Sequence, residues 1–328
     1  MANDQDSAPV AQPNVFDPPA RYYALGAYMR REFGGTVRKI SVDAHFSCPN
    51  IDGTVGRGGC VFCDAASFSP SRQIGLVEID DQIADGITRL QRRFDAKQFI
   101  AYFQPSTNTH APVDVLERVY RAALRRPEIV GIAIGTRPDA CPDPVLDLLA
   151  TLARETWTTL ELGLQSSHDR TLNWLGRGHD YGQFVDATMR ARARNLQVGA
   201  HVILGLPGET REDVRTTARR LGTLGLHSIK IHHLYVVKGT RLERLWRAGE
   251  VSLPTLEEYA DLVVDFLERL SPETVVERVA GEVGDEYLVA PSWTAIKHAG
   301  RNAVDKALRA RDSYQGKYYD PERRDPYA

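Results

Sequence analysis

The sequence predicts an α/β fold built on a parallel sheet. Short apolar runs rich in β-branched and aromatic residues recur along the chain, and each is followed by a polar turn and an amphipathic helical stretch. The unit repeats every 30 residues or so, roughly the length of a strand with its crossover helix. Strands that alternate with helices imply parallel pairing through right-handed crossovers. Six such units can form either a doubly wound sheet or an incomplete barrel.

The strands share a short, continuous apolar pattern, and the helices space their apolar residues by three and four. Strands are expected at 37–43, 98–103, 129–135, 158–164, 198–205 and 228–237. Helices are expected at 77–94, 112–124, 144–154, 184–194 and 211–225. Asp143 and Thr210 are predicted to cap two of these helices. No GxGxxG follows the first strand, which weakens a dinucleotide-binding interpretation.

Beyond about residue 250 the alternation stops, and the pattern predicts helices at 253–270 and 292–311 with a short strand at 274–280. We therefore expect a disordered lead-in at 1–17, a core at 18–250, and a C-terminal helical extension with a polar tail at 251–328. The chain has 328 residues, 42% hydrophobic and 26% charged, with a formal net charge of −2. This composition is that of a globular protein and gives no sign of a strongly basic nucleic-acid protein.

The four cysteines point to a metal in a reducing compartment. Cys48, Cys60 and Cys63 crowd into CPNIDGTVGRGGCVFC, directly after the first strand. A disulfide-stapled secreted domain would spread its cysteines out. No apolar run is long enough to span a membrane, and the N-terminus lacks the features of a secretory signal. The predicted location is the cytoplasm.

Three kinds of site compete for this cluster. A structural zinc site would need a fourth ligand, which His45 or the distant Cys141 would have to supply. A thioredoxin-like C-x-x-C leaves the third cysteine and the glycine-rich loop unexplained. A [4Fe-4S] cluster held by three cysteines leaves one iron open to bind a small molecule. The pattern favours the open cluster.

The segments that carry these cysteines resemble a bacterial radical S-adenosylmethionine (SAM) family related to the elongator-type tRNA-modifying enzymes. The resemblance covers roughly residues 20–300 and includes SCPNIDGTVGRGGCVFC, FIAYFQPSTNTHAP, IGTRPDACPD, LELGLQSSHDRTLNWLGRGH, HVILGLPGET and IKIHHLYVVKGT. That family lengthens the first gap of the usual C-x3-C-x2-C motif, and this sequence has C-x11-C-x2-C.

The resemblance implies a fold, a cofactor pair and a reaction. The fold would be a partial (β/α)6 radical SAM barrel, with its site at the carboxyl ends of the strands and an α-rich C-terminal extension. Cys48, Cys60 and Cys63 would hold a [4Fe-4S] cluster, which would reductively cleave SAM to a 5′-deoxyadenosyl radical. An electron donor such as flavodoxin or ferredoxin would reduce the cluster.

The resemblance also implies which residues face SAM, since most of them follow the predicted strands. These candidates are Phe62, Gln104, Ser106, Asn108, Arg137, Gln165, Ser166, Gly205, Glu209, His232 and Tyr235. Arg177 and His179 are expected either to reach an anionic substrate or to lie in a solvated loop. Cys141 is a candidate catalytic hydrogen-atom donor or site of a substrate adduct, with a bystander thiol as the alternative.

The relationship suggests a tRNA base as substrate. Arginines cluster at 92–93, 121–126 and 215–220, where they could contact phosphates, although arginines on helical faces are usually solvated and paired. The alternatives are radical modification of a small metabolite or peptide, and a non-catalytic protein that binds a metal or cluster.

Overall fold

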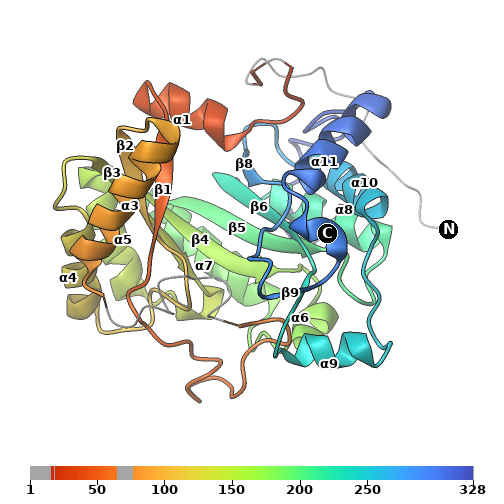
Figure 1. Ribbon diagram of the computed structural model, residues 1–328, viewed down its shortest axis with the longest axis horizontal. Helices are drawn as coiled ribbons and strands as arrows, with labels where there is room; N and C mark the ends of the chain where they lie inside the picture. The colour runs from red at the N-terminus through yellow and green to blue at the C-terminus, as the bar shows by residue number, and fades with distance from the viewer. Residues whose placement is uncertain (1–15, 18, 65–76, 328) are drawn as a thin grey trace. The chain divides into compact units, whose positions relative to one another are not determined.

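A computed structural model describes residues 16–17, 19–64 and 77–327. Seven strands form a sheet in the order β1-β2-β3-β4-β5-β6-β8 (Figure 1). They are β1 (Val37–Val42), β2 (Gln98–Phe103), β3 (Ile129–Thr136), β4 (Trp157–Gln165), β5 (Gln197–Leu204), β6 (Ser228–His233) and β8 (Val275–Arg278). The pairs β1–β2, β2–β3, β3–β4 and β6–β8 are parallel. The predicted α/β class with a parallel sheet is confirmed.

Helices occupy the crossovers, as predicted. They are α3 (Ile79–Phe94), α4 (Val113–Ala123), α5 (Asp143–Glu155), α7 (Tyr181–Ala193) and α8 (Arg211–Gly222), followed by α10 (Leu256–Leu267) and α11 (Ala299–Ala310). The sequence did not predict α1 (Leu25–Phe33), α6 (Asp169–Leu175), α9 (Arg241–Arg247) or the one-turn helix η2 (Pro138–Ala140). The helix predicted at 292–311 is interrupted, because its first residues form the separate one-turn helix η3 (Ser292–Ala295) and α11 begins only at Ala299. No helix among the described residues is long and apolar enough to cross a membrane.

Two local predictions about the helices differ in outcome. Thr210 caps α8 in a reciprocal capping box with Asp213, as expected. Asp143 is not a cap, because Pro142 occupies that position and Asp143 is already the first helical residue. Proline suits the start of a helix because it lacks the N–H that would be unsatisfied there.

The predicted strand at 228–237 is too long. It ends at His233, and Val236–Val237 (β7) instead pairs antiparallel with β9 (Leu288–Ala290) in a separate two-stranded sheet. Tyr235 therefore lies between β6 and β7 rather than on a strand.

The chain divides into two compact units. Unit 2 comprises residues 29–164 and 173–200, and unit 1 comprises 1–28, 165–172 and 201–328. In unit 2, strands β2 and β3 are buried along almost their whole length, as expected for strands covered on both faces. Tyr120 of α4 packs edge-on against Phe103 at 5.3 Å between ring centroids.

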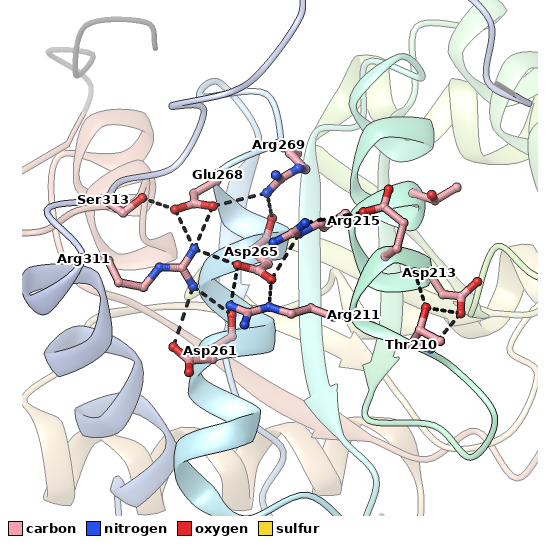
Figure 2. A network of polar contacts seen from close by, with 12 residues as sticks. Thr210, Arg211, Asp213, Arg215, Asp261, Asp265, Glu268, Arg269, Arg311 and Ser313 are labelled. Carbon is pink, nitrogen blue, oxygen red and sulfur yellow. Dashed lines mark hydrogen bonds and ion pairs between the residues drawn. The ribbon is translucent and has the colours of Figure 1, made fainter. Parts of the chain in front are cut away.

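A network of arginines and carboxylates joins three helices of unit 1 (Figure 2). Asp265 of α10 is fully buried and accepts hydrogen bonds from Arg211 and Arg215 of α8 and from Arg311, which follows α11. Glu268 accepts from Arg311 at 3.0 Å, and also from Ser313 at 2.6 Å. A buried carboxylate is tolerated only when it is paired in this way.

The segments before α1 and after α11 are ordered by contacts within unit 1. Gln315 is fully buried, and its amide donates to the carbonyls of Ser271 and Thr274 at 2.6 and 2.8 Å. Ala24 forms a parallel bridge with Val276 of β8, and the backbone N–H of Val276 donates to the backbone carbonyl of Tyr23.

The predicted lead-in at 1–17 falls, up to residue 15, outside the described residues. Phe16 is 4% exposed and belongs to the packed structure. The division of the chain at residue 250 stays a prediction.

Candidate functional site

The three clustered cysteines lie in a loop of turns that follows β1. Cys60 is buried, whereas Cys48 and Cys63 are half-buried. Asp52 organises the loop, since its carboxylate accepts hydrogen bonds from Ser47, from the backbone and side chain of Thr54, and from His110. These hydrogen bonds hold the pKa of Asp52 well below its usual range.

The three thiols are close enough for the charge of one to change the pKa of another. Burial, followed by the neighbouring charges of Cys60 and Cys48, raises the pKa of Cys63 to about 12. Among the described residues, no three His, Cys, Asp or Glu side chains are gathered so that they could hold a metal ion. The described residues thus show no closed tetrahedral site of the kind that structural zinc uses. A [4Fe-4S] cluster does not require its cysteines to meet at one metal ion, because each thiolate binds a separate iron.

Cys60 receives hydrogen bonds from two side chains of unit 2. Nη1 of Arg177 lies 3.1 Å from the Cys60 sulfur, and Nδ2 of Asn50 lies 3.6 Å from it. Asn50 also donates to the carbonyl of Gly176 at 2.6 Å, and Val61 donates its N–H to the carbonyl of Leu175 at 2.9 Å. The cysteine loop and the segment after α6 are therefore joined at several points.

Arg177 is buried, and each nitrogen of its guanidinium donates a hydrogen bond. Besides Cys60, it donates to the Gly163 carbonyl at 2.5 Å and to Nε2 of His179 at 3.2 Å. Burial, together with the positive charges of Arg177 and Arg137, lowers the pKa of His179 to about 3, so this imidazole is a neutral acceptor. The solvated-loop interpretation of Arg177 and His179 is wrong, since they are 7% and 5% exposed.

Arg137 lies beside this segment. Its guanidinium forms a two-pronged ion pair with Asp139 at 2.8 and 2.9 Å, and Nη2 also donates to the Arg177 carbonyl at 2.6 Å. Burial alone would lower the pKa of Arg137, but Asp139 and the thiolate forms of Cys48 and Cys60 raise it. Its Nη1 is buried and has no hydrogen-bond partner among the described residues.

The candidates after β2 serve partly to shape their own loop. Asn108 is fully buried, and its amide donates to the carbonyls of Phe103, Pro105 and Gly135 at 2.9 to 3.0 Å. Its side-chain oxygen has no partner among the described residues. Ser106 has a left-handed backbone, and Gln104 and Phe62 are half-buried. A contact of any of these with SAM stays a prediction.

A second group of candidates belongs to unit 1. Ser166 donates to Glu209 at 2.5 Å, and burial raises the pKa of Glu209 despite hydrogen bonds from Ser166 and Thr171. Gln165 ends β4 with φ of 79°, a strained value for a residue with a side chain. Strain of this kind gathers at functional sites, which supports the choice of Gln165. Gly205 shares this backbone conformation with φ of 79°.

His232 and Tyr235 lie together against Gly281. A side chain at Gly281 would collide with both, because its Cβ would lie 2.7 Å from Tyr235 Cε1 and 3.1 Å from His232 Nδ1. His233 points the other way into packed aromatics, with its Nε2 2.8 Å from the Thr294 hydroxyl and its ring 4.2 Å from that of Trp293. Alternation along the strand separates the two histidines as expected.

Cys141 is 2% exposed, and its sulfur donates to the Arg137 carbonyl at 3.4 Å. Burial raises the pKa of this thiol to about 12. These features favour the bystander thiol, and a catalytic role for Cys141 stays a prediction.

Two family models match the chain. The model described as the radical SAM superfamily matches residues 52–221, which include Cys60 and Cys63 and begin just after Cys48. A model described as the radical SAM C-terminal domain matches residues 226–310. The chain belongs to the radical SAM superfamily. Membership implies a [4Fe-4S] cluster and SAM, and the three thiols with N–H donors directed at Cys60 fit such a cluster chemically.

This radical SAM protein is similar to relatives of two kinds. The protein YtqA of Bacillus subtilis is 39% identical over 302 residues, which are 91% of this chain and 93% of YtqA. A tRNA uridine(34) acetyltransferase of Methanocaldococcus infernus is 30% identical over 149 residues, which are 44% of this chain and 27% of that protein. The predicted relationship to elongator-type radical SAM proteins is confirmed.

A solved structure shows the same fold at low identity. The Elp3 protein of the archaeon Methanocaldococcus infernus aligns with a TM-score of 0.65 and 18% identity over 85% of this chain, which spans 64% of that longer protein. The predicted partial radical SAM barrel is thereby confirmed as the fold class.

Sequence reasoning named the cysteines but missed the contact of Arg177 with Cys60. These two residues are 117 positions apart. The only local signal is the pair of glycines around Arg177, which permits a tight turn that directs a side chain inward.

Proposed function

We propose that this protein is a radical SAM enzyme whose [4Fe-4S] cluster is held by Cys48, Cys60 and Cys63. The observation that carries the proposal is the loop itself. It brings three thiols within electrostatic range and directs N–H donors of Arg177 and Asn50 toward the sulfur of Cys60. Thiolates of iron–sulfur clusters accept hydrogen bonds of this kind.

Bound in this loop, the cluster would supply the electron that cleaves SAM to a 5′-deoxyadenosyl radical. The chain would bind and orient the cofactor and exclude water from it. Arg137 offers a buried N–H without a partner among the described residues, which suits an anionic or carbonyl group of a ligand. Gln165, Ser166, Glu209, His232 and Tyr235 are the further residues proposed to contact SAM. A flavodoxin or ferredoxin would deliver the electron in the reducing cytoplasm.

The proposed substrate is a tRNA base. The similarity to a tRNA uridine(34) acetyltransferase supports it, although that similarity covers 27% of the relative. The arginine clusters support it less than expected, because most of these side chains are already engaged. Arg121 pairs with Glu117 and Glu155, and Arg126 pairs with Asp80. Neutralised arginines contribute little to phosphate binding.

The first experiment tests the cluster and the cleavage of SAM. We would reconstitute the purified protein without oxygen and measure iron and 5′-deoxyadenosine after adding SAM and dithionite. We expect about four irons per chain and product from the wild type, and neither from Cys60→Ala. Cys141→Ala is the matched control for iron uptake, because it removes a thiol outside the loop. A wild type that retains zinc instead of iron would contradict the proposal.

The second experiment tests the substrate. Nucleosides of total tRNA from a deletion strain would be compared with those of the parent strain and of a strain complemented with Cys60→Ala. We expect one modified nucleoside to be lost in the deletion strain and not restored by the variant. An unchanged profile in a protein that cleaves SAM would favour a small metabolite or peptide instead.

A further inference from the structure

Arg177 is a buried cation whose partners are almost all neutral. In the described part of the chain it donates to a backbone carbonyl, to a neutral imidazole and to the sulfur of Cys60, and it forms no ion pair with a carboxylate. A buried charge without a counter-charge is costly, so the structure calls for a negative partner at this point. Among the described residues, the one acceptor in contact with Arg177 that can carry a negative charge is the sulfur of Cys60.

The position of Arg177 is fixed by its surroundings rather than by Cys60 alone. Its backbone carbonyl accepts from Arg137, and the contacts to Gly163 and His179 hold the other two nitrogens of the guanidinium. Arg137 itself is neutralised by Asp139. The uncompensated positive charge of this group of residues therefore resides on Arg177.

We propose that Arg177 is a positioning residue that raises the reduction potential of the cluster through its N–H donor to Cys60. Reduction adds one electron from the external donor and hence one negative charge to the cluster. A nearby fixed cation favours the more negative, reduced form, and so do hydrogen bonds to the ligand sulfur. This inference rests on the proposed cluster, but neither on the cleavage of SAM nor on tRNA.

The test is a redox titration of reconstituted protein with dithionite, in which the reduced cluster is followed by electron paramagnetic resonance. Arg177→Met removes the charge and the donor at similar volume, and Arg177→Gln keeps an N–H donor without the charge. Arg126→Met is the matched control, because Arg126 is paired with Asp80 on the surface. Iron content is measured for every variant.

We expect Arg177→Met to bind iron and to lower the equilibrium constant for one-electron reduction at least about tenfold, a fall of about 59 mV. Arg177→Gln should show a smaller fall in the same direction, and Arg126→Met should match the wild type. An unchanged potential in iron-loaded Arg177→Met would overturn the inference. If Arg177→Met does not take up iron, an unchanged potential in iron-loaded Arg177→Gln would overturn the inference instead.

Loss of iron from both neutral variants would also overturn the inference, since Arg177 would then be needed to build the site rather than to tune it. A wild type that takes up no iron is a different result. It would contradict the proposed function itself, and this difference separates the two failures.

Discussion

Two glycines with left-handed backbones enclose Arg177 and turn its side chain inward. Gly176 has φ of 66° and Gly178 has φ of 69°. A Cβ at Gly178 would lie 2.9 Å from Cγ1 of Val55 and 3.1 Å from Oδ1 of Asn50, both in the cysteine loop. The turn thus combines a strained backbone with a close approach of two segments, and only glycine meets both requirements.

Gly178→Ala should therefore destabilise the protein and weaken iron binding. We expect a loss of about 1–3 kcal/mol in the free energy of unfolding, together with lower iron content after reconstitution. Gly249→Ala is the control, because Gly249 has φ of 76° but nothing within 4 Å of its Cβ position. Equal iron contents in the two variants would show that contact with the cysteine loop is unimportant.

Cys141 offers a second test at the scale of one residue. A buried thiol with a pKa of about 12 carries almost no thiolate at pH 8. We expect iodoacetamide to leave Cys141 unmodified in the folded apoprotein and to alkylate it after denaturation, as measured by peptide mass spectrometry. Rapid alkylation of the native protein would instead support the catalytic prediction.

At the scale of elements, three of the helices that the structure describes begin with a reciprocal capping box. They are α7 with Asp180 and Gln183, α8 with Thr210 and Asp213, and α10 with Thr255 and Glu258. Each box satisfies backbone N–H groups that the first turn leaves without partners. The exposed Thr255 isolates this effect, since its hydroxyl accepts from the Glu258 N–H at 3.2 Å.

Thr255→Ala should lower the free energy of unfolding by about 1 kcal/mol, measured by urea denaturation. Thr255→Ser should be destabilised much less than Thr255→Ala, because serine caps a helix as well as threonine does. Ser252→Ala, at an exposed position before the helix, should have no effect. A loss confined to the alanine variant at 255 would assign the effect to the cap.

Asp213 links the cap of α8 to the dependence of stability on pH. Burial would raise its pKa, but hydrogen bonds from Arg170 and Thr210 outweigh burial and lower it from 3.8 to about 2. The contribution of this group to stability is present above pH 4 and is lost as the pH falls toward 2. In Asp213→Asn, the dependence of melting temperature on pH should be shallower in that interval, whereas the slope above pH 5 should match the wild type.

At the scale of the whole molecule, stability depends on contacts between residues far apart in the sequence. Asp265 is fully buried among arginines from α8 and from the segment after α11 (Figure 2). These hydrogen bonds oppose the effect of burial and hold the pKa of Asp265 below its usual range. Removal of the carboxylate would leave several cations close together without a shared counter-charge.

Asp265→Ala should lower the free energy of unfolding by about 3 kcal/mol, the lower end for a broken buried pair, because its arginines are partly exposed. Asp261→Ala is the control, since Asp261 is half-exposed and 3.7 Å from Arg311, and it should cost less than about 1 kcal/mol. Similar losses in chemical denaturation would contradict a central role for Asp265.

The sequence located the sheet well because its strands are continuous apolar runs. The predicted strand at 98–103 is observed at those residues, and 129–135 differs from β3 by one residue. The short helices α6 and α9 have too few turns to show periodicity, and the run at 228–237 hid a break, because apolar residues continue through it. Such boundaries depend on pairing partners distant in the sequence.

The site was predictable to the extent that its chemistry is local. The spacing of Cys48, Cys60 and Cys63 in one short segment predicts a site for a metal or cluster and favours the open cluster. The contact of Arg177 with Cys60 could not be predicted from the sequence. An arginine between two glycines has the composition of an exposed turn, and the two residues are far apart along the chain. Asn108 was predicted to face SAM, but its side-chain amide donates hydrogen bonds to carbonyls of its own loop.

The bridge between Ala24 and Val276 has a consequence for behaviour at high protein concentration. The edge of a sheet with unpaired donors and acceptors can recruit a strand from another molecule and begin aggregation. Here the segment before α1 occupies the side of β8 that β6 leaves open. Proteolytic removal of this segment would expose a ready template for intermolecular pairing, so a nicked protein should aggregate under conditions in which the intact one stays dispersed.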